Sequence, residues 1–76
     1  MNNQRRKKLK EARELLEQAL FIIQEVKDEE QESFDNMPEG LQTSEKGEQM
    51  ENNISELEDV DSNIQTSLDS IDTILE

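Results

Sequence analysis

The most regular segment of the chain reads LKEARELLEQALFIIQEV and spans residues 9–26. Its apolar residues recur at alternating intervals of three and four, which is the heptad repeat of a coiled coil. The residues on this predicted seam are Leu9, Ala12, Leu16, Ala19, Ile23 and Val26. Strong helix formers fill the positions between them, and no Gly or Pro precedes Pro38. We therefore predict one helix over about residues 3–32.

The second half of the chain carries the same repeat. Its seam residues are Met50, Ile54, Leu57, Asp61, Ile64, Leu68, Ile71 and Leu75. They predict a helix over about residues 44–75, similar in length to the first. Two long helices joined by a short link favour an all-α, antiparallel hairpin that forms a single domain over residues 1–76. We expect its core to contain Leu16, Ile23, Ile54, Leu57, Ile64 and Leu68.

Two residues of the second helix allow alternative interpretations. Asp61 is the one polar residue on the seam, and we expect Val60 to replace it in the core while Asp61 turns toward solvent. A buried Asp61 would instead need a cationic or hydrogen-bonding partner and would fix the register of the two helices. Gly47 is either a poor helix former tolerated near a helix end, which we favour, or a place where another backbone comes close.

The link covers about residues 33–43 and contains the only Pro of the chain. Asn36 followed by Glu39 resembles a capping box, which predicts a short turn at residues 38–41 that Gly40 would end. Ser44 is a suitable N-cap for the second helix. The apolar residues Phe34, Met37 and Leu41 are expected to fill the closed end of the hairpin.

Charge is unevenly distributed along the chain. Six basic residues and one acid give residues 1–13 a net charge of +5, whereas two lysines and 19 acids give the remainder −17. An antiparallel hairpin places the basic start beside Asp69, Asp72 and Glu76, so we expect this start to pair within the chain. The acidic body should repel nucleic acid and anionic membranes and attract a basic protein surface.

The middle of the first helix is apolar over almost its whole circumference, so a single neighbouring helix cannot bury it. We expect the remaining apolar residues to form an interface, made by Leu15, Leu20, Phe21 and Ile22. The plainest occupant is a second copy, which gives a homodimeric four-helix bundle. The alternative occupant is a partner protein from the host.

Several classes of function lack the residues that they require. The chain has no His, Cys, Trp or Tyr, and it shows no nucleophile and base pair, phosphate-binding loop or zinc spacing. We therefore expect no enzyme activity, cofactor, metal or small-molecule substrate. The longest apolar run is Leu20 to Ile23, which is too short for a membrane span or a signal peptide, so we expect a cytoplasmic protein.

One long stretch resembles a known signature. Residues 29–51 read EEQESFDNMPEGLQTSEKGEQME. This segment is similar to the pattern EEQExFDNxPExLQxSExGExME of small uncharacterised proteins from phages and prophages of Gram-positive bacteria. Those proteins also share a basic start and two heptad-rich flanks. The resemblance implies a phage-derived helical accessory protein in the host cytoplasm. The signature fits either a demanding turn or a contact surface, which includes the link residues Phe34, Asn36, Pro38 and Leu41.

Two main classes of function are compatible with these features. The first is a small acidic interaction factor that inhibits a host nucleic-acid-binding or defence protein. Its candidate contact face contains Glu25, Asp28, Glu29, Glu32 and Asp35. The alternative is a structural or assembly dimerisation module without inhibitory activity. In a third and weaker class, the basic start binds nucleic acid or membrane directly.

Overall fold

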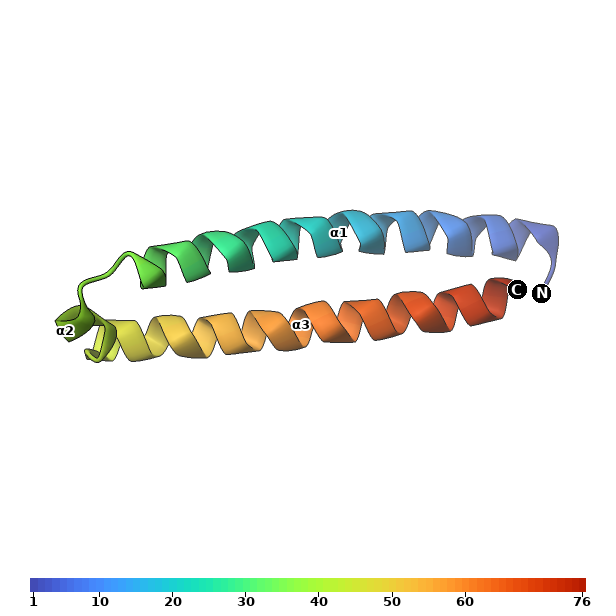
Figure 1. Ribbon diagram of the computed structural model, residues 1–76. Helices are drawn as coiled ribbons and strands as arrows, with labels where there is room; N and C mark the ends of the chain where they lie inside the picture. The colour runs from blue at the N-terminus through green and yellow to red at the C-terminus, as the bar shows by residue number, and fades with distance from the viewer.

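The computed structural model describes all residues from 1 to 76 and contains only helices. Helix α1 spans Asn3–Asp35, α2 spans Glu39–Gln42 and α3 spans Glu45–Leu75. Figure 1 shows α1 and α3 side by side in opposite directions, with both chain ends at one end and α2 at the other. The predicted all-α helical hairpin is confirmed.

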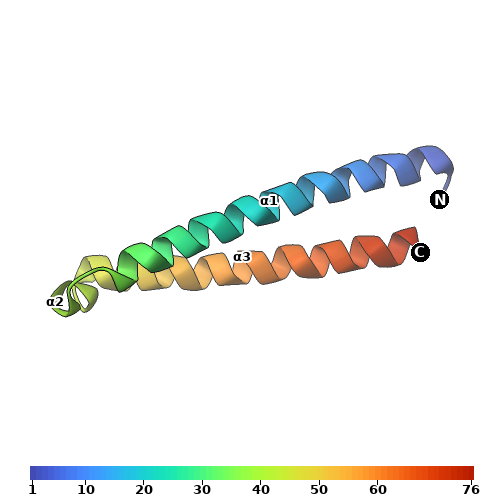
Figure 2. The ribbon, with the colours of Figure 1, turned by 45° about the horizontal axis from the view of Figure 1, so that its top comes forward.

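The hairpin is long and narrow. Its Cα trace extends 58 Å along the main axis and 14 Å along each of the other two. Figure 2 shows that α1 and α3 are inclined to each other rather than strictly parallel, as helices packed through a heptad seam usually are. A rod of this shape buries few side chains. Its least exposed apolar residues are Leu20, Ile54 and Leu68, each 7% exposed.

The seam of α3 follows the predicted repeat without interruption. Its buried and half-buried residues are Gly47, Met50, Ile54, Leu57, Asp61, Ile64, Leu68, Ile71 and Leu75. The expected core residues Leu57 and Ile64 are half-buried, as are Leu16 and Ile23 of α1.

The observed seam of α1 lies on a different side of the helix from the predicted one, as if the helix were rotated about its own axis. Its buried and half-buried members include Leu9, Arg13, Leu16, Leu20, Ile23, Lys27 and Phe34. The prediction was right for Leu9, Leu16 and Ile23 but wrong for Ala12, Ala19 and Val26, which are exposed. Arg13, Leu20 and Lys27 take their places. The rotation buries a larger apolar side chain at Leu20 and lets the two basic side chains meet acids of α3.

Asp61 corrects a second expectation. It is only 6% exposed, whereas Val60, which was expected to replace it, is 38% exposed. The Nζ of Lys27 lies 3.1 Å from the Asp61 carboxylate, and the side-chain amide of Gln65 donates to the same group at 2.5 Å. With a cation from α1 available, α3 keeps its repeat and buries the carboxylate.

The link also differs from the prediction in detail. Asn36 ends α1, with its backbone N–H bonded to the Glu32 carbonyl at 3.0 Å, and it does not cap α2. Pro38 occupies the N-cap position of α2 without a side-chain bond. Gly40 lies inside α2 rather than at its end. The backbone N–H groups of Leu41 and Gln42 both donate to the Pro38 carbonyl, so the helical turn continues past Gly40.

Side chains and a close backbone contact hold the closed end together. The Gln42 amide donates to the carbonyls of Phe34 and Met37, at 2.9 and 3.2 Å. Phe34 and Met37 are half-buried, but Leu41 is exposed, so Leu41 does not fill this end as expected.

The start of α3 explains Gly47. The Ser44 hydroxyl caps the helix by accepting from the Gly47 N–H at 3.3 Å, as predicted. Gly47 is buried, and a Cβ there would lie 2.5 Å from the carbonyl carbon of Gln42 and 2.6 Å from the Leu41 oxygen. The close approach of a second backbone is therefore the correct interpretation, and the tolerance of a poor helix former is not.

Candidate interaction surfaces

The hairpin has two broad faces, one on each side of the plane through α1 and α3. On one of them lies a set of exposed, mainly apolar residues that we call the apolar face. They are Ala12, Leu15, Ala19, Ile22 and Val26 of α1 with Val60, Ser67 and Ile74 of α3. Leu15 is 60% exposed and Ile22 is 61% exposed. One shallow groove of this face is lined by three apolar residues, Val26, Leu57 and Val60, and three polar ones, Glu30, Asn53 and Glu56.

The spacing of the apolar face repeats that of the seam. Its α1 residues follow one another at intervals of three, four, three and four, and its α3 residues at intervals of seven. Such a stripe turns with the helix at the rate of a coiled-coil seam. The apolar face thus has the geometry of a second helix-packing seam beside the first, with no residue of this chain covering it.

The opposite face, which we call the polar face, has a different composition. It contains Lys10, Glu17, Gln24 and Gln31 of α1 with Glu51, Glu58, Gln65 and Asp72 of α3. Several of these side chains bond to residues of the seam. The Nη1 of Arg13, a seam residue, donates to the Glu17 carboxylate at 2.7 Å.

Arg13 also joins the two helices at this face. Its Nε and Nη2 donate to the two carboxylate oxygens of Asp72, at 2.5 and 3.1 Å. This paired contact holds the pKa of Asp72 below its ordinary value, and the bonds to Asp72 and Glu17 raise the pKa of Arg13. The expected pairing of the basic start with the end of the chain therefore occurs at Asp72. At Leu75 the contact is different, because Arg6 donates to its backbone carbonyl.

A polar layer lies within the seam at Asp61. Hydrogen bonds from Gln65 and then from Lys27 lower the pKa of Asp61 and outweigh the opposing effect of burial. The Gln24 amide lies 3.4 Å from the same carboxylate. Gln24 and Gln65 approach from the polar face, so this face and the layer form one connected network. A charged pair inside a seam specifies which residues face each other.

The predicted interface residues separate into three groups. Leu15 and Ile22 lie on the apolar face. Leu20 is buried against α3, so its assignment to an exposed interface was wrong: it lies on the seam that α1 presents after rotation. Phe21 is exposed but belongs to another side of the helix, because one residue turns an α-helix by about 100°.

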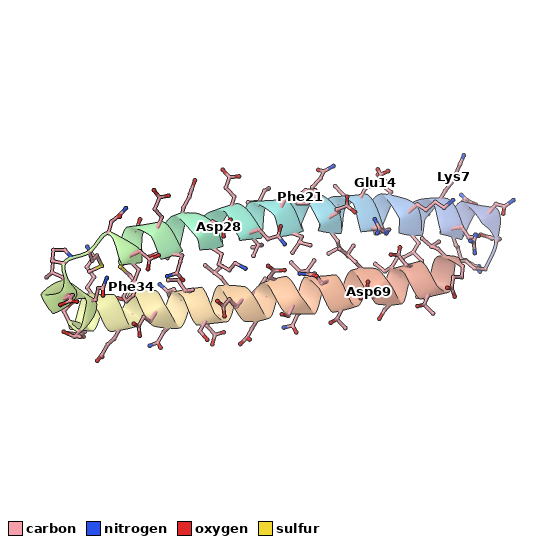
Figure 3. All side chains as sticks on the ribbon, viewed as in Figure 1. Lys7, Glu14, Phe21, Asp28, Phe34 and Asp69 are labelled. Carbon is pink, nitrogen blue, oxygen red and sulfur yellow. The ribbon has the colours of Figure 1, made fainter.

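Figure 3 makes the position of Phe21 clear. Lys7, Glu14, Phe21 and Asp28 follow one another at intervals of seven along α1, so they form one row. Phe21 is the one apolar member of this row, and it lines a shallow depression with Glu17 and Gln65 beside the polar face. Five further residues share the apolar face: Ala12, Ala19 and Val26, which were predicted to lie on the seam, and Val60 and Ile74 of α3. For the three residues of α1, the signal was present as a second set of three and four intervals.

The predicted acidic contact face is exposed throughout. Glu25, Asp28, Glu29, Glu32 and Asp35 all lie on the solvent side of α1 near the closed end. Asp35 accepts a hydrogen bond from Gln31 at 3.0 Å. Nowhere in the chain do three or more acidic side chains gather closely enough to hold a metal ion.

The link residues of the signature have different surroundings. Asn36 and Pro38 shape the turn, Phe34 closes the hairpin, and Leu41 projects into solvent. Neither long helix contains a segment with the length and hydropathy needed to cross a membrane. Comparison of the chain with protein-family models, with curated proteins and with solved structures found no match.

Proposed function

We propose that this chain is a protein–protein interaction module that works as a homodimer, in which two hairpins meet through their apolar faces and form a four-helix bundle. The apolar face carries the proposal. It has the spacing of a helix-packing seam, and its bulky members Leu15, Ile22 and Ile74 are all more than half exposed.

The small core of the hairpin supports the same proposal. Only three apolar residues are as little as 7% exposed, and no side chain is completely buried. Chains of this length rarely hold together on so small a core without disulfides, metals or self-association, and this one has no cysteine. Covering the apolar face with a second copy would supply the missing burial and remove a contiguous apolar patch from water.

Light scattering coupled to size exclusion tests the proposal with two matched variants. Ile22→Asp places a carboxylate on the apolar face, and Phe21→Asp makes the same change at the neighbouring residue outside it. We expect wild type and Phe21→Asp to have the mass of two chains and Ile22→Asp that of one. A wild-type mass of one chain, 8.9 kDa, would refute the proposal.

A second candidate function uses the acidic residues. Glu25, Asp28, Glu29, Glu32 and Asp35 are exposed and cluster toward one end, and none forms an ion pair. In this candidate they occupy the basic surface of a host nucleic-acid-binding or defence protein, within the bacterial cytoplasm that the phage-like signature implies. The apolar face then serves only to hold the dimer together.

Charge reversal separates the two functions. The triple variant Glu25→Lys, Asp28→Lys and Glu32→Lys should remain helical, since lysine is a good helix former. If the acidic residues bind a basic host protein, host proteins retained by immobilised wild type in a salt-sensitive way should be lost with this variant. Equal retention by both would leave the dimerisation module as the function.

A further inference from the structure

The heptad stripe of the apolar face continues beyond its apolar residues. Toward the start of α1 it runs through Lys8 and Arg5, and toward the end through Glu29 and Ser33, at the same intervals of three and four. Ala19 stands at its centre. Residues at nearly equal separations from Ala19 form complementary pairs. Bulky Leu15, four residues before it, matches bulky Ile22, three after it, and cationic Lys8, eleven before, matches anionic Glu29, ten after.

We propose that the second copy packs with its α1 antiparallel to the first α1, on a two-fold axis that passes beside Ala19. This inference rests on the proposed homodimer and specifies its geometry. The axis pairs Ala12 with Val26 of the second copy and Leu15 with Ile22 of the second copy. Lys8 of each chain then lies beside Glu29 of the other, so the interface has an apolar centre and an ion pair at each end.

The charges of the whole helix agree with this direction. Residues 5–13 carry six basic groups and one acid, a net +5, while residues 25–35 carry six acids and Lys27, a net −5. Antiparallel pairing places the positive half of each α1 along the negative half of the other. A parallel pair would set Lys8 against Lys8 and Glu29 against Glu29, which is repulsive.

Helix α3 fits the same axis. Val26 and Val60 line one groove, and the two helices run in opposite directions, so Ser67 lies level with Ala19. Val60 and Ile74 are each seven residues from Ser67. The axis beside Ala19 therefore places Val60 opposite Ile74 of the second copy and Ser67 opposite its own counterpart. Small side chains at Ala19 and Ser67 allow the helices to approach closely at the axis.

The other face-to-face arrangement is less complementary. If α1 packed on α3 of the second copy, Glu29 would lie near Glu56 of that copy. Ile22 would lie near its Asn63. That arrangement replaces an apolar contact and an ion pair with a polar mismatch and a pair of like charges. Like charges placed together at an interface disfavour the arrangement that contains them.

Single cysteines read out the arrangement, because the natural chain has none. A disulfide forms only when the two Cα atoms are about 4.4–6.8 Å apart. Ala19→Cys should therefore link to itself on mild oxidation, since each copy meets its own counterpart at the axis. Ala12→Cys alone should not link, whereas a mixture of Ala12→Cys and Val26→Cys should give the mixed disulfide. Circular dichroism of the reduced variants checks that their helices are retained.

The outcomes separate this inference from the homodimer itself. A linked Ala19→Cys dimer supports the inference. If Ala19→Cys fails to link but a mixture of Ala19→Cys and Ser67→Cys does, α1 packs on α3 of the second copy, and the inference is wrong while the homodimer stands. If no combination links and light scattering gives the mass of one chain, both proposals fail.

A charge exchange provides a second test without new covalent bonds. Lys8→Glu and Glu29→Lys should each weaken homodimerisation, by about fivefold, because each sets like charges together at both ends of the interface. Mixing the two variants in equal amounts should form a heterodimer with both ion pairs restored. Sedimentation measurements that find no rescue on mixing would contradict the antiparallel register.

Discussion

The two broad faces of the hairpin differ in whether their side chains find partners within the chain. On the polar face, Glu17 and Asp72 accept hydrogen bonds from Arg13 of the seam, and Gln24 and Gln65 donate to the buried Asp61. On the apolar face, Leu15 and Ile22 project from the chain with nothing against them. Polar groups can find partners within two helices, but two helices cannot enclose a wide apolar stripe.

This contrast assigns different tasks to the two faces. The polar network fixes which residues of α1 and α3 face each other, since ion pairs and buried hydrogen bonds are specific to one register. The apolar stripe has no partner within the chain, and in our proposal it is the surface through which two copies associate. Loss of the polar network should therefore disturb the hairpin, whereas loss of the apolar stripe should disturb the dimer.

The largest effect is expected from a charge at one of the bulky residues of the apolar face. Leu15→Asp should weaken dimerisation by about a thousandfold, or about 4 kcal/mol, because two carboxylates would be buried without partners. Thermal unfolding followed by circular dichroism checks this. The midpoint of the wild type should rise with protein concentration, as it does when folding and association are linked. The midpoint of Leu15→Asp should be low and independent of concentration.

The polar network is tested by changing the layer at Asp61. Lys27→Met removes the cation and leaves a charge on the seam, so the variant should lose much of its helicity. Lys27→Met combined with Asp61→Leu replaces the pair by apolar residues and should be at least as stable as wild type. Urea denaturation of the two variants measures the difference. If the double variant is no more stable than Lys27→Met, the polar layer at Asp61 stabilises the hairpin by more than its ion pair with Lys27.

The close backbone contact of Gly47 at the closed end of the hairpin can be tested by substitution. Gly47→Ala drives a methyl group into the backbone of Gln42 and should cost about 2 kcal/mol of the free energy of unfolding. Gly40→Ala is the matched control, because nothing lies within 4 Å of a Cβ there. It should stabilise the chain by up to about 1 kcal/mol, since Ala favours a helix over Gly. Equal effects of the two changes would contradict the assignment.

The smallest effect concerns pH at the polar face. Arg13 lowers the pKa of Asp72 below its ordinary 3.8, so the ionised carboxylate stabilises the fold. This contribution is complete above about pH 5 and disappears as the pH falls through the lowered pKa. Asp72→Asn should therefore be less stable than wild type at pH 7, with a difference that vanishes in acid. Comparing the two chains removes the general effect of protonating the other acids.

The hairpin could be predicted from the sequence because its strongest signals are local. The repeat of α3, the long run of helix formers and the cap at Ser44 depend on neighbours in sequence. The rotation of α1 depends on residues far away in the chain. Two stripes share Leu9, Leu16 and Ile23, and the one that includes Arg13 and Lys27 is selected by Asp72 and Asp61. Ranking residues by hydrophobicity alone favours the other stripe.

The candidate interface shows the same division. Leu15 and Ile22 were identified because the middle of α1 is too apolar for one neighbour. Leu20 and Phe21 belong to the same apolar run. Only the orientation of the helix about its axis shows that Leu20 lies in the core and that Phe21 lies on another side of the helix. Val60 was expected to replace Asp61 in the core, and its exposure follows from the burial of Asp61 beside it.

Small-angle X-ray scattering tests most directly whether the hairpins associate through their apolar faces, because it reports mass and shape together. Face-to-face packing predicts twice the mass of the 8.9 kDa chain with a length close to the 58 Å of one hairpin and a thicker cross-section. A scattering mass of one chain, or a dimer about twice as long as the hairpin, would contradict association through the apolar face.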